Sequence, residues 1–308
     1  MMLLAEGLCV VACSDGASSS SAGSNPDGST TTLPDGAPID DGGLLADGSN
    51  PTSDAPAGYT PLSIPGIALW LESNTSPSLP ATWTDLSANG NDAVLSSGME
   101  APDRNSSTLN GHAPLVFHGY TSYEIADAPS LQWGTGDFLI EAVCHNNYNE
   151  SQESAGGTGG TTYYWFDGSY IRYRFGEVVS KVPSGFGPGL SLVFNDWSDR
   201  SYKIVGQVEI NTAVKAPSKF YLEEPRVLGF RRKGNVLELR SNGAVTATML
   251  DASANQDVSA VGTKLFIGGR PSLTHFVGAF WEIIAVKGTV SDADVTAFEA
   301  YAKAKYAL

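Results

Sequence analysis

The chain has 308 residues, of which 42% are hydrophobic and 34 are glycine, and its formal net charge is −15. This hydrophobic share suffices for one sizeable core, and the glycines indicate many turns. The acidic balance argues against nucleic acid and anionic membrane surfaces as partners, because both bind through Lys and Arg.

The N-terminal sequence MMLLAEGLCVVAC holds an apolar run that is too short to span a bilayer. Its last four residues, VVAC, resemble the cleavage box of bacterial lipoproteins. The resemblance implies that residues 1–12 are a signal peptide and that Cys13 is the lipid acceptor. We therefore expect the protein to be extracytoplasmic, either lipid-anchored to the bacterial envelope or secreted, with the lipid as its only membrane contact.

The next segment, residues 13–58, is rich in Ser, Gly, Asp and Pro, and from Ser14 to Gly58 it has no Lys, Arg or Glu. Such a composition cannot bury enough apolar surface to offset the entropy lost on ordering. The sequence predicts a disordered tether here and a folded domain over residues 59–308.

The stretch WTDLSANGNDAV, residues 83–94, places several side-chain oxygens around Gly90. An EF-hand is excluded, because residue 96, the twelfth position counted from Asp85, is Ser rather than Glu and neither flank is helical. Two hypotheses remain. The residues form Asx-type turns between strands, or Asp85, Asn89 and Asp92 contribute to a structural calcium site with oxygens from distant loops.

Strands are predicted by short β-branched and aromatic runs that Gly, Asn, Asp and Pro interrupt. GYTS (119–122) is suited to a hairpin turn, and the polar, Gly-rich residues 146–162 to a loop. The runs are IALWL (67–71), PLVFH (114–118), SYEI (122–125), DFLIEAVC (137–144), YYWF (163–166) and YIRYRF (170–175).

The segment RVLGFRRKGNVLELRSNGAVTATML, residues 226–250, predicts three alternating strands. Lys233-Gly234-Asn235 and Ser241-Asn242-Gly243 separate them and suit tight turns. The segment is therefore predicted to be an antiparallel meander.

This meander resembles the laminin G-like members of the concanavalin A-like lectin and glucanase superfamily. The same order of motifs extends to ALWL (68–71), WTDLSANGNDA, NGHAPLVFHG (110–119), KLFIGGRP (264–271) and the closing residues 276–306. The resemblance covers most of residues 62–308. It implies an all-β, two-sheet antiparallel jelly-roll sandwich, in a family whose members often carry calcium.

One short C-terminal helix is predicted independently of the family. Ser291 and Asp294 have the spacing of a capping box, and Val295, Phe298 and Ala302 form one apolar stripe. We expect this helix to cover a face of the sandwich.

Hydrolase signatures are absent from the sequence. The superfamily's glucanases carry Glu-x-Asp-x-x-Glu on one strand, and no such run exists here. Glu141 and Glu282 each stand alone among apolar residues, which favours a solvent-facing position over catalysis. The lone Cys144 is expected in the core.

The candidate glycan contacts are aromatic and basic residues. Trp133 and Trp197, in Gly- or Asp-flanked segments, are candidate stacking platforms. The basic cluster around Arg231 and Arg232 could bind sulfated or uronic polysaccharide, or simply protect a sheet edge.

The sequence thus predicts a noncatalytic carbohydrate-binding or adhesion module whose partner is a glycan or cell-surface polysaccharide. It requires no cofactor, and a structural calcium ion is the one cofactor that the Asp85 stretch leaves open. The alternatives are a glycoside hydrolase or polysaccharide lyase built from distant residues, and an envelope protein that binds another protein.

Overall fold

The computed structural model describes residues 57–75, 81–104, 108–146, 163–164, 170–171, 176–183, 187–194, 203–209, 212–217, 224–251, 256–270 and 276–308. All of them belong to one compact unit, Ser49–Leu308. The predicted signal peptide, the lipid acceptor Cys13, most of the tether and the candidate platform Trp197 lie outside the described residues. No helix among the described residues is long and apolar enough to cross a membrane.

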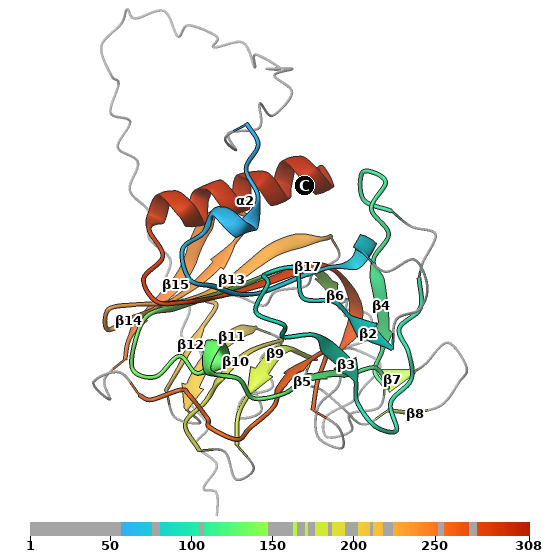
Figure 1. Ribbon diagram of the computed structural model, residues 1–308, viewed down its shortest axis with the longest axis horizontal. Coiled ribbons are helices and arrows are strands. Elements are labelled where there is room, and N and C mark those ends of the chain that lie inside the picture. The colour runs from blue at the N-terminus through green and yellow to red at the C-terminus, as the bar shows by residue number, and fades with distance from the viewer. Residues whose placement is uncertain are drawn as a thin grey trace, which may run out of the picture. The chain divides into compact units, whose positions relative to one another are not determined.

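Two antiparallel sheets dominate the described chain, as the sequence predicts, and Figure 1 shows them stacked beneath the C-terminal helix. The seven-stranded sheet runs, in spatial order, through β1 (Ile67–Glu72), β17 (Val277–Lys287), β6 (Phe138–Asn146), β13 (Arg226–Lys233), β14 (Val236–Ser241) and β15 (Ala244–Leu250), with β4 (Leu115–His118) also paired to β17.

The second sheet has eight strands. In spatial order these are β12 (Thr212–Lys215), β11 (Ile204–Glu209), β10 (Leu190–Phe194), β9 (Gly176–Lys181), β16 (Leu265–Ile267), β5 (Tyr123–Ile125), β3 (Ala93–Leu95) and β2 (Thr82–Trp83). The short strands β7 (Tyr163–Tyr164) and β8 (Tyr170–Ile171) pair with each other, and single 3₁₀ turns occupy η1 (Pro61–Ser63), η2 (Ser73–Thr75) and η3 (Pro129–Leu131).

The main core lies between the two sheets. Alternate residues of each strand point into it, because successive side chains in a strand face opposite sides. On β6 these are Phe138, Ile140, Ala142 and Cys144, and all four are buried. Cys144 is therefore a core residue, as predicted, and burial raises the pKa of its thiol.

The sheets approach closely at Gly206 on β11. A Cβ at this position would lie 2.2 Å from the ring of Phe230 on β13, in the opposite sheet. Glycine is therefore required for the two backbones to pack at this distance.

The helix α2 (Asp292–Tyr306) begins where the capping box predicts. The Ser291 hydroxyl accepts the backbone N–H of Asp294 at 3.0 Å. Val295, Phe298 and Ala302 are buried against the outer face of the seven-stranded sheet, where they form a second apolar cluster with residues such as Leu139 and Val143 of β6. Because this sheet is covered on both faces, β6 reads as a nearly continuous apolar run.

The predicted meander is confirmed as β13, β14 and β15, joined by tight turns. Gly234, Asn242 and Gly243 adopt positive φ, as such turns require. The hairpin predicted at GYTS is wrong. Strand β4 pairs with β17 in one sheet, whereas β5 pairs with β3 and β16 in the other, so this segment passes between the sheets.

Candidate functional site

The Asp85 turn, predicted as either a calcium loop or an Asx turn, is held by hydrogen bonds within the chain. Asp85 Oδ1 accepts the backbone N–H of Trp70 at 3.0 Å and of Ser87 at 2.9 Å. Its Oδ2 accepts the N–H of Asn91 at 2.9 Å and the Ser87 hydroxyl at 2.8 Å. Asp92 Oδ1 accepts the N–H of Asp85 itself. Both oxygens of Asp85 thus already accept hydrogen bonds from backbone N–H groups, which favours the Asx-type turn over the calcium site.

Asn89 takes part in the same turn as a donor. Its Nδ2 donates to the Ile67 carbonyl and the Ser87 hydroxyl, both at 2.9 Å. Within the described residues, no group of three or more His, Cys, Asp or Glu side chains is placed to hold a metal ion. The structure therefore brings Asp85, Asn89 and Asp92 together, but around backbone groups.

Trp133 does not offer a platform for a sugar. It is only 2% exposed and belongs to the main core, where its Nε1–H donates to the Val286 carbonyl at 3.2 Å. The Lys181 ammonium lies 5.9 Å from its ring centroid. The prediction that Trp133 is a stacking platform is wrong. The residues that follow it, including Gly134 and Gly136, form a turn, and the ring lies in the interior.

The glycan role predicted for Arg231 and Arg232 is also wrong, since their exposed fractions are 2% and 0%. The edge interpretation fails as well, because β13 pairs with β6 on one side and β14 on the other. Arg231 points to the helix side and donates to Asp292 at 2.7 Å and to the Val290 carbonyl at 2.5 Å.

Arg232 points the opposite way, into one end of the sandwich. Its guanidinium donates to the carbonyls of Gly134, Gly136 and Gln256 at 2.5 to 2.8 Å. It lies 3.7 Å from Asp251. A buried guanidinium in this setting is a structural tie between loops.

The two strand glutamates that the sequence placed in solvent are both fully buried beneath α2. Glu282 accepts from Trp70 Nε1 at 2.7 Å, Tyr306 Oη at 2.8 Å and Lys305 Nζ at 2.9 Å. Burial raises the pKa of Glu282, although these partners oppose the rise. Since the helix covers Glu141 and Glu282, neither is placed to act on an external substrate.

The outer face of the eight-stranded sheet is the candidate binding site. One continuous row of paired residues crosses all eight strands on this face. The residues next to them along the strands point into the core, so the paired residues themselves point outward. These inward neighbours include Ala93, Leu265, Ile267, Val179 and Leu192. The row consists of Thr82, Val94, Glu124, Phe266, Ser180, Ser191, Gln207 and Ala213.

The accessible part of the row that contains an aromatic ring lies over β2, β3, β5 and β16. Thr82 and Val94 are exposed, while Glu124 and Phe266 are partly exposed. Ser180 on β9 and Ser191 on β10 are buried and separate this part from Gln207 and Ala213, which are also partly exposed. The open part therefore combines one aromatic ring with hydroxyl and carboxylate groups, a combination able to stack on and hydrogen-bond a polar ligand.

Charges on this face are paired with one another. Lys264 Nζ lies 2.6 Å from Glu124 Oε1, and Arg270 NH2 lies 2.8 Å from Glu177 Oε1. Glu177 and its partner Arg270 are largely buried, whereas the Lys264 side chain is 51% exposed. The face is thus polar, but these cations are already neutralised by carboxylates.

Sequence reasoning missed Phe266. In KLFIGGRP the run Leu265, Phe266, Ile267 is entirely apolar, so alternation alone does not show which residue faces outward. The polar neighbour Lys264, two residues before Phe266, is the only local signal for the outward register.

No protein-family model matches the chain, and no curated protein sequence matches it. Solved structures with a similar fold include domain 4 of AbnA, a GH43 extracellular arabinanase from Geobacillus stearothermophilus, in complex with arabinotriose. It has 11% sequence identity and a TM-score of 0.50, covering 75% of this chain and 96% of that domain.

Two toxin structures resemble this chain to a comparable degree. The binding domain of botulinum neurotoxin serotype G has 10% identity and a TM-score of 0.52, covering 77% of this chain and 51% of its own. The binding domain of Paraclostridial Mosquitocidal Protein 1 has 12% identity and a TM-score of 0.50, covering 76% and 52%. This chain therefore spans about half the length of these toxin chains.

The sheet topology and these likenesses define the class of fold. The described chain is a concanavalin A-like, two-sheet antiparallel jelly-roll sandwich with one short C-terminal helix.

Proposed function

We propose that this protein is a noncatalytic carbohydrate-binding domain that engages glycan with the outer face of its eight-stranded sheet. The observation that carries the proposal is the open part of the cross-strand row, where Phe266 lies beside Glu124 and Lys264. An aromatic ring flanked by hydrogen-bonding groups matches a pyranose or furanose ring, which has an apolar C–H face and polar edges.

The pairing of charges on this face favours a neutral glycan. Lys264 is bound by Glu124, and Arg270 by Glu177. A sulfated or uronic polysaccharide would have to displace these carboxylates, and Arg231 and Arg232, the residues predicted to bind such a ligand, are buried. Neutral hydroxyl groups, in contrast, can add to the existing ion pairs through hydrogen bonds.

The fold supports the proposal at a coarser level. AbnA domain 4, which shares the sandwich, was solved with arabinotriose, and the two toxin structures are of binding domains. The similarity of these folds supports a binding role for the sandwich of this protein.

We further propose that the domain is a laminin G-like module displayed outside the cytoplasm. The support is sequence alone. It comprises the VVAC box with Cys13 as lipid acceptor, a Ser, Gly, Asp and Pro-rich tether, and the motifs shared with that family. A tether of this length would hold the binding face away from the membrane.

A glycan array probed with the full chain tests the proposal. We expect binding to neutral oligosaccharides that Phe266→Ala weakens about tenfold or more, because loss of a stacking ring removes at least about 1.4 kcal/mol. Val261→Ala is the matched control, since Val261 is 72% exposed and lies outside the row. Absence of glycan binding, or equal effects of the two substitutions, would contradict the proposal and favour a protein partner.

A further inference from the structure

Glu141 is a buried carboxyl group without a hydrogen-bond partner. It lies in the middle of β6, on the face that α2 covers, between the buried residues Leu139 and Val143. Its exposed fraction is 0%, and neither carboxyl oxygen has a hydrogen-bond partner in the described part of the chain. An ionised carboxylate in such a place would lose its hydration without compensation.

The room for this side chain comes from Gly229. In the strand register, Gly229 of β13 lies opposite Glu141 on one side and opposite Arg240 of β14 on the other. A Cβ at position 229 would be 3.0 Å from Glu141 Oε1 and 3.2 Å from Arg240 Cβ. The missing side chain thus leaves space for the Glu141 carboxyl group over β13.

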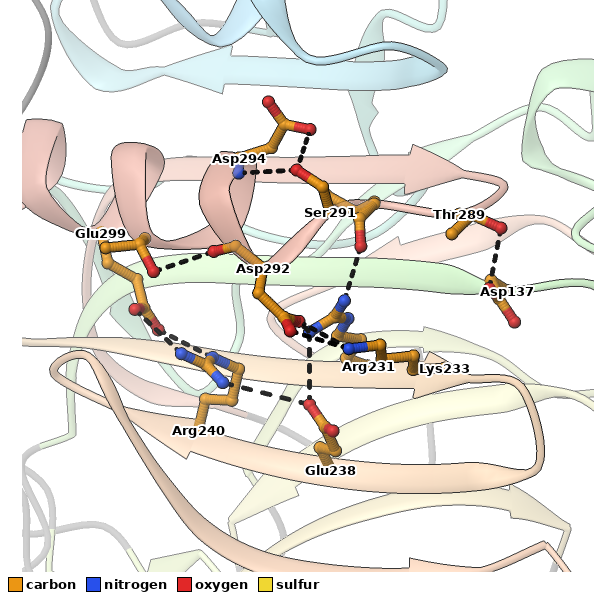
Figure 2. Close-up of polar contacts among 12 residues, drawn as sticks. Asp137, Arg231, Lys233, Glu238, Arg240, Thr289, Ser291, Asp292, Asp294 and Glu299 are labelled. Carbon is orange, nitrogen blue, oxygen red and sulfur yellow. Dashed lines mark hydrogen bonds and ion pairs between the residues drawn. The ribbon is translucent and has the colours of Figure 1, made fainter.

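The cations around this site are already used by other carboxylates, as Figure 2 shows. Arg240 donates to both oxygens of Glu299 on α2, at 2.9 and 3.1 Å. Arg231 and Lys233 bind Asp292 at 2.7 and 2.8 Å.

Glu238 is the remaining carboxylate of this network. It lies 3.5 Å from Arg231 and 4.0 Å from Arg240. Three cations, Arg231, Lys233 and Arg240, therefore face three carboxylates, Glu238, Asp292 and Glu299. Glu141 is a fourth carboxyl group, and none of these cations forms an ion pair with it within 4.0 Å.

The groups on the remaining elements do not supply one. Lys305 on α2 is bound to Glu282 on β17 and to Glu72 on β1. The Tyr59 hydroxyl, on the residue before η1, is no cation, and burial raises its pKa. Lys303, on the turn after Glu299, forms no ion pair within 4.0 Å among the described residues.

We propose that Glu141 is protonated in the folded protein at neutral pH and thereby makes the docking of α2 on the seven-stranded sheet dependent on pH. A neutral Glu141 tolerates the nearby carboxylate of Glu299 on α2, whereas an ionised Glu141 on the sheet and Glu299 on the helix repel each other. The other carboxyl groups between α2 and the sheet, Asp292, Glu299 and Glu282, each have a cation within 4.0 Å, whereas Glu141 has none among the residues that the structure describes and lies among the apolar residues of the interface. A change in its proton occupancy therefore acts directly on docking.

The direction of the pH effect follows from the burial. Burial first, and then the charge of Glu299, raise the pKa of Glu141 well above its ordinary value of 4.5, although the charges of Arg240 and Arg231 oppose the rise. The unfolded chain has that ordinary pKa, so the stabilisation from the bound proton is complete below it. The stabilisation is lost as pH rises from there through the pKa of the folded state. Docking should therefore weaken toward alkaline pH.

The first test compares denaturant unfolding of the full chain with that of Glu141→Gln, which imitates the protonated form, from about pH 5 to about pH 9. We expect the unfolding constant of the wild type, relative to the variant, to rise up to about tenfold per pH unit until Glu141 ionises. Glu238→Gln is the control and should retain the wild-type pH slope. Parallel profiles for wild type and Glu141→Gln would overturn the proposal.

Two further measurements do not depend on the stability of the variant. In the wild type, infrared spectroscopy at neutral pH should show the C=O band of a protonated carboxyl group, which disappears in alkali. Lack of that band would overturn the protonation of Glu141. Hydrogen exchange of the α2 amides, corrected for intrinsic rates, should increase with pH relative to that of β6 and β17. Equal changes in helix and sheet would overturn the link to helix docking.

Discussion

The indole Nε1–H of Trp70 donates to Oε1 of Glu282 at 2.7 Å and so joins β1 to β17 beneath the C-terminal helix. The same carboxylate receives Lys305 and Tyr306 from the end of α2. One buried anion thus holds two strands and the chain terminus together.

Substitution Glu282→Gln should lower the free energy of unfolding by about 3 kcal/mol, because it removes the buried partner of Lys305 and leaves that ammonium under-compensated. Urea denaturation of the full chain measures this loss. Glu124→Gln is the control. It breaks an ion pair whose lysine is half exposed, and should cost less than about 1 kcal/mol. Similar losses for the two variants would show that the Glu282 network contributes little to stability.

A second test concerns Lys181, whose side chain is fully buried at one end of the sandwich. Its Nζ donates to Asp127 and to the carbonyls of Leu131 and Ser259, at 2.6 to 3.0 Å. Lys181→Met should destabilise the fold by about 3 kcal/mol, because three buried or half-buried acceptors lose their donor. Lys264→Met, at an exposed ion pair, should change stability by less than about 1 kcal/mol. Thermal or urea unfolding of both variants measures this difference. Equal losses of stability for Lys181→Met and Lys264→Met would contradict the prediction.

Much of the fold could be predicted from local sequence. The meander followed from turn residues that adopt positive φ, namely Gly234, Asn242 and Gly243, between alternating strands. The helix followed from its cap at Ser291 and from its apolar stripe. Both kinds of signal act within a few residues, so the sequence displays them directly.

The orientation of charged residues on strands could not be predicted in this way. Arg231 and Arg232 are adjacent in sequence but point to opposite faces, one to α2 and one into the sandwich. Both are buried, because other elements cover both faces of β13. Glu141 and Glu282 were misplaced for the same reason. A lone Glu in an apolar strand is expected in solvent unless a distant helix covers it.

The candidate site shows the same limit. Asp85 and its neighbours were recognised as a cluster, but their hydrogen bonds to Trp70 and Ala68, residues of β1, depend on strand pairing. Phe266 is outward only because β16 pairs with β5 and β9 in one register. Register is a property of the whole sheet, which local patterns do not specify.

The Asp85 turn yields a prediction about calcium. Asp85→Ala should lower stability by about 2 to 3 kcal/mol, because the backbone N–H groups of Trp70, Ser87 and Asn91 lose their acceptor. In the wild type, EDTA and added calcium should give the same melting temperature, since these N–H groups already occupy the carboxylate. A melting temperature that rises with calcium concentration would instead support an ion at Asp85 and Asp92.

The last prediction concerns the response of glycan binding to salt. Raising the salt concentration from about 0.1 M to about 1 M shortens the Debye length from about 10 Å to about 3 Å, which weakens contacts between exposed charges. Because Lys264 and Arg270 are paired within the face, binding of a neutral glycan should change by less than about twofold over this range. Titration calorimetry with an array-selected oligosaccharide measures this, with the Phe266→Ala variant as the reference for loss of stacking. An affinity that falls steeply with salt would show that the ligand is an anion and that the Lys264–Glu124 pair opens to receive it.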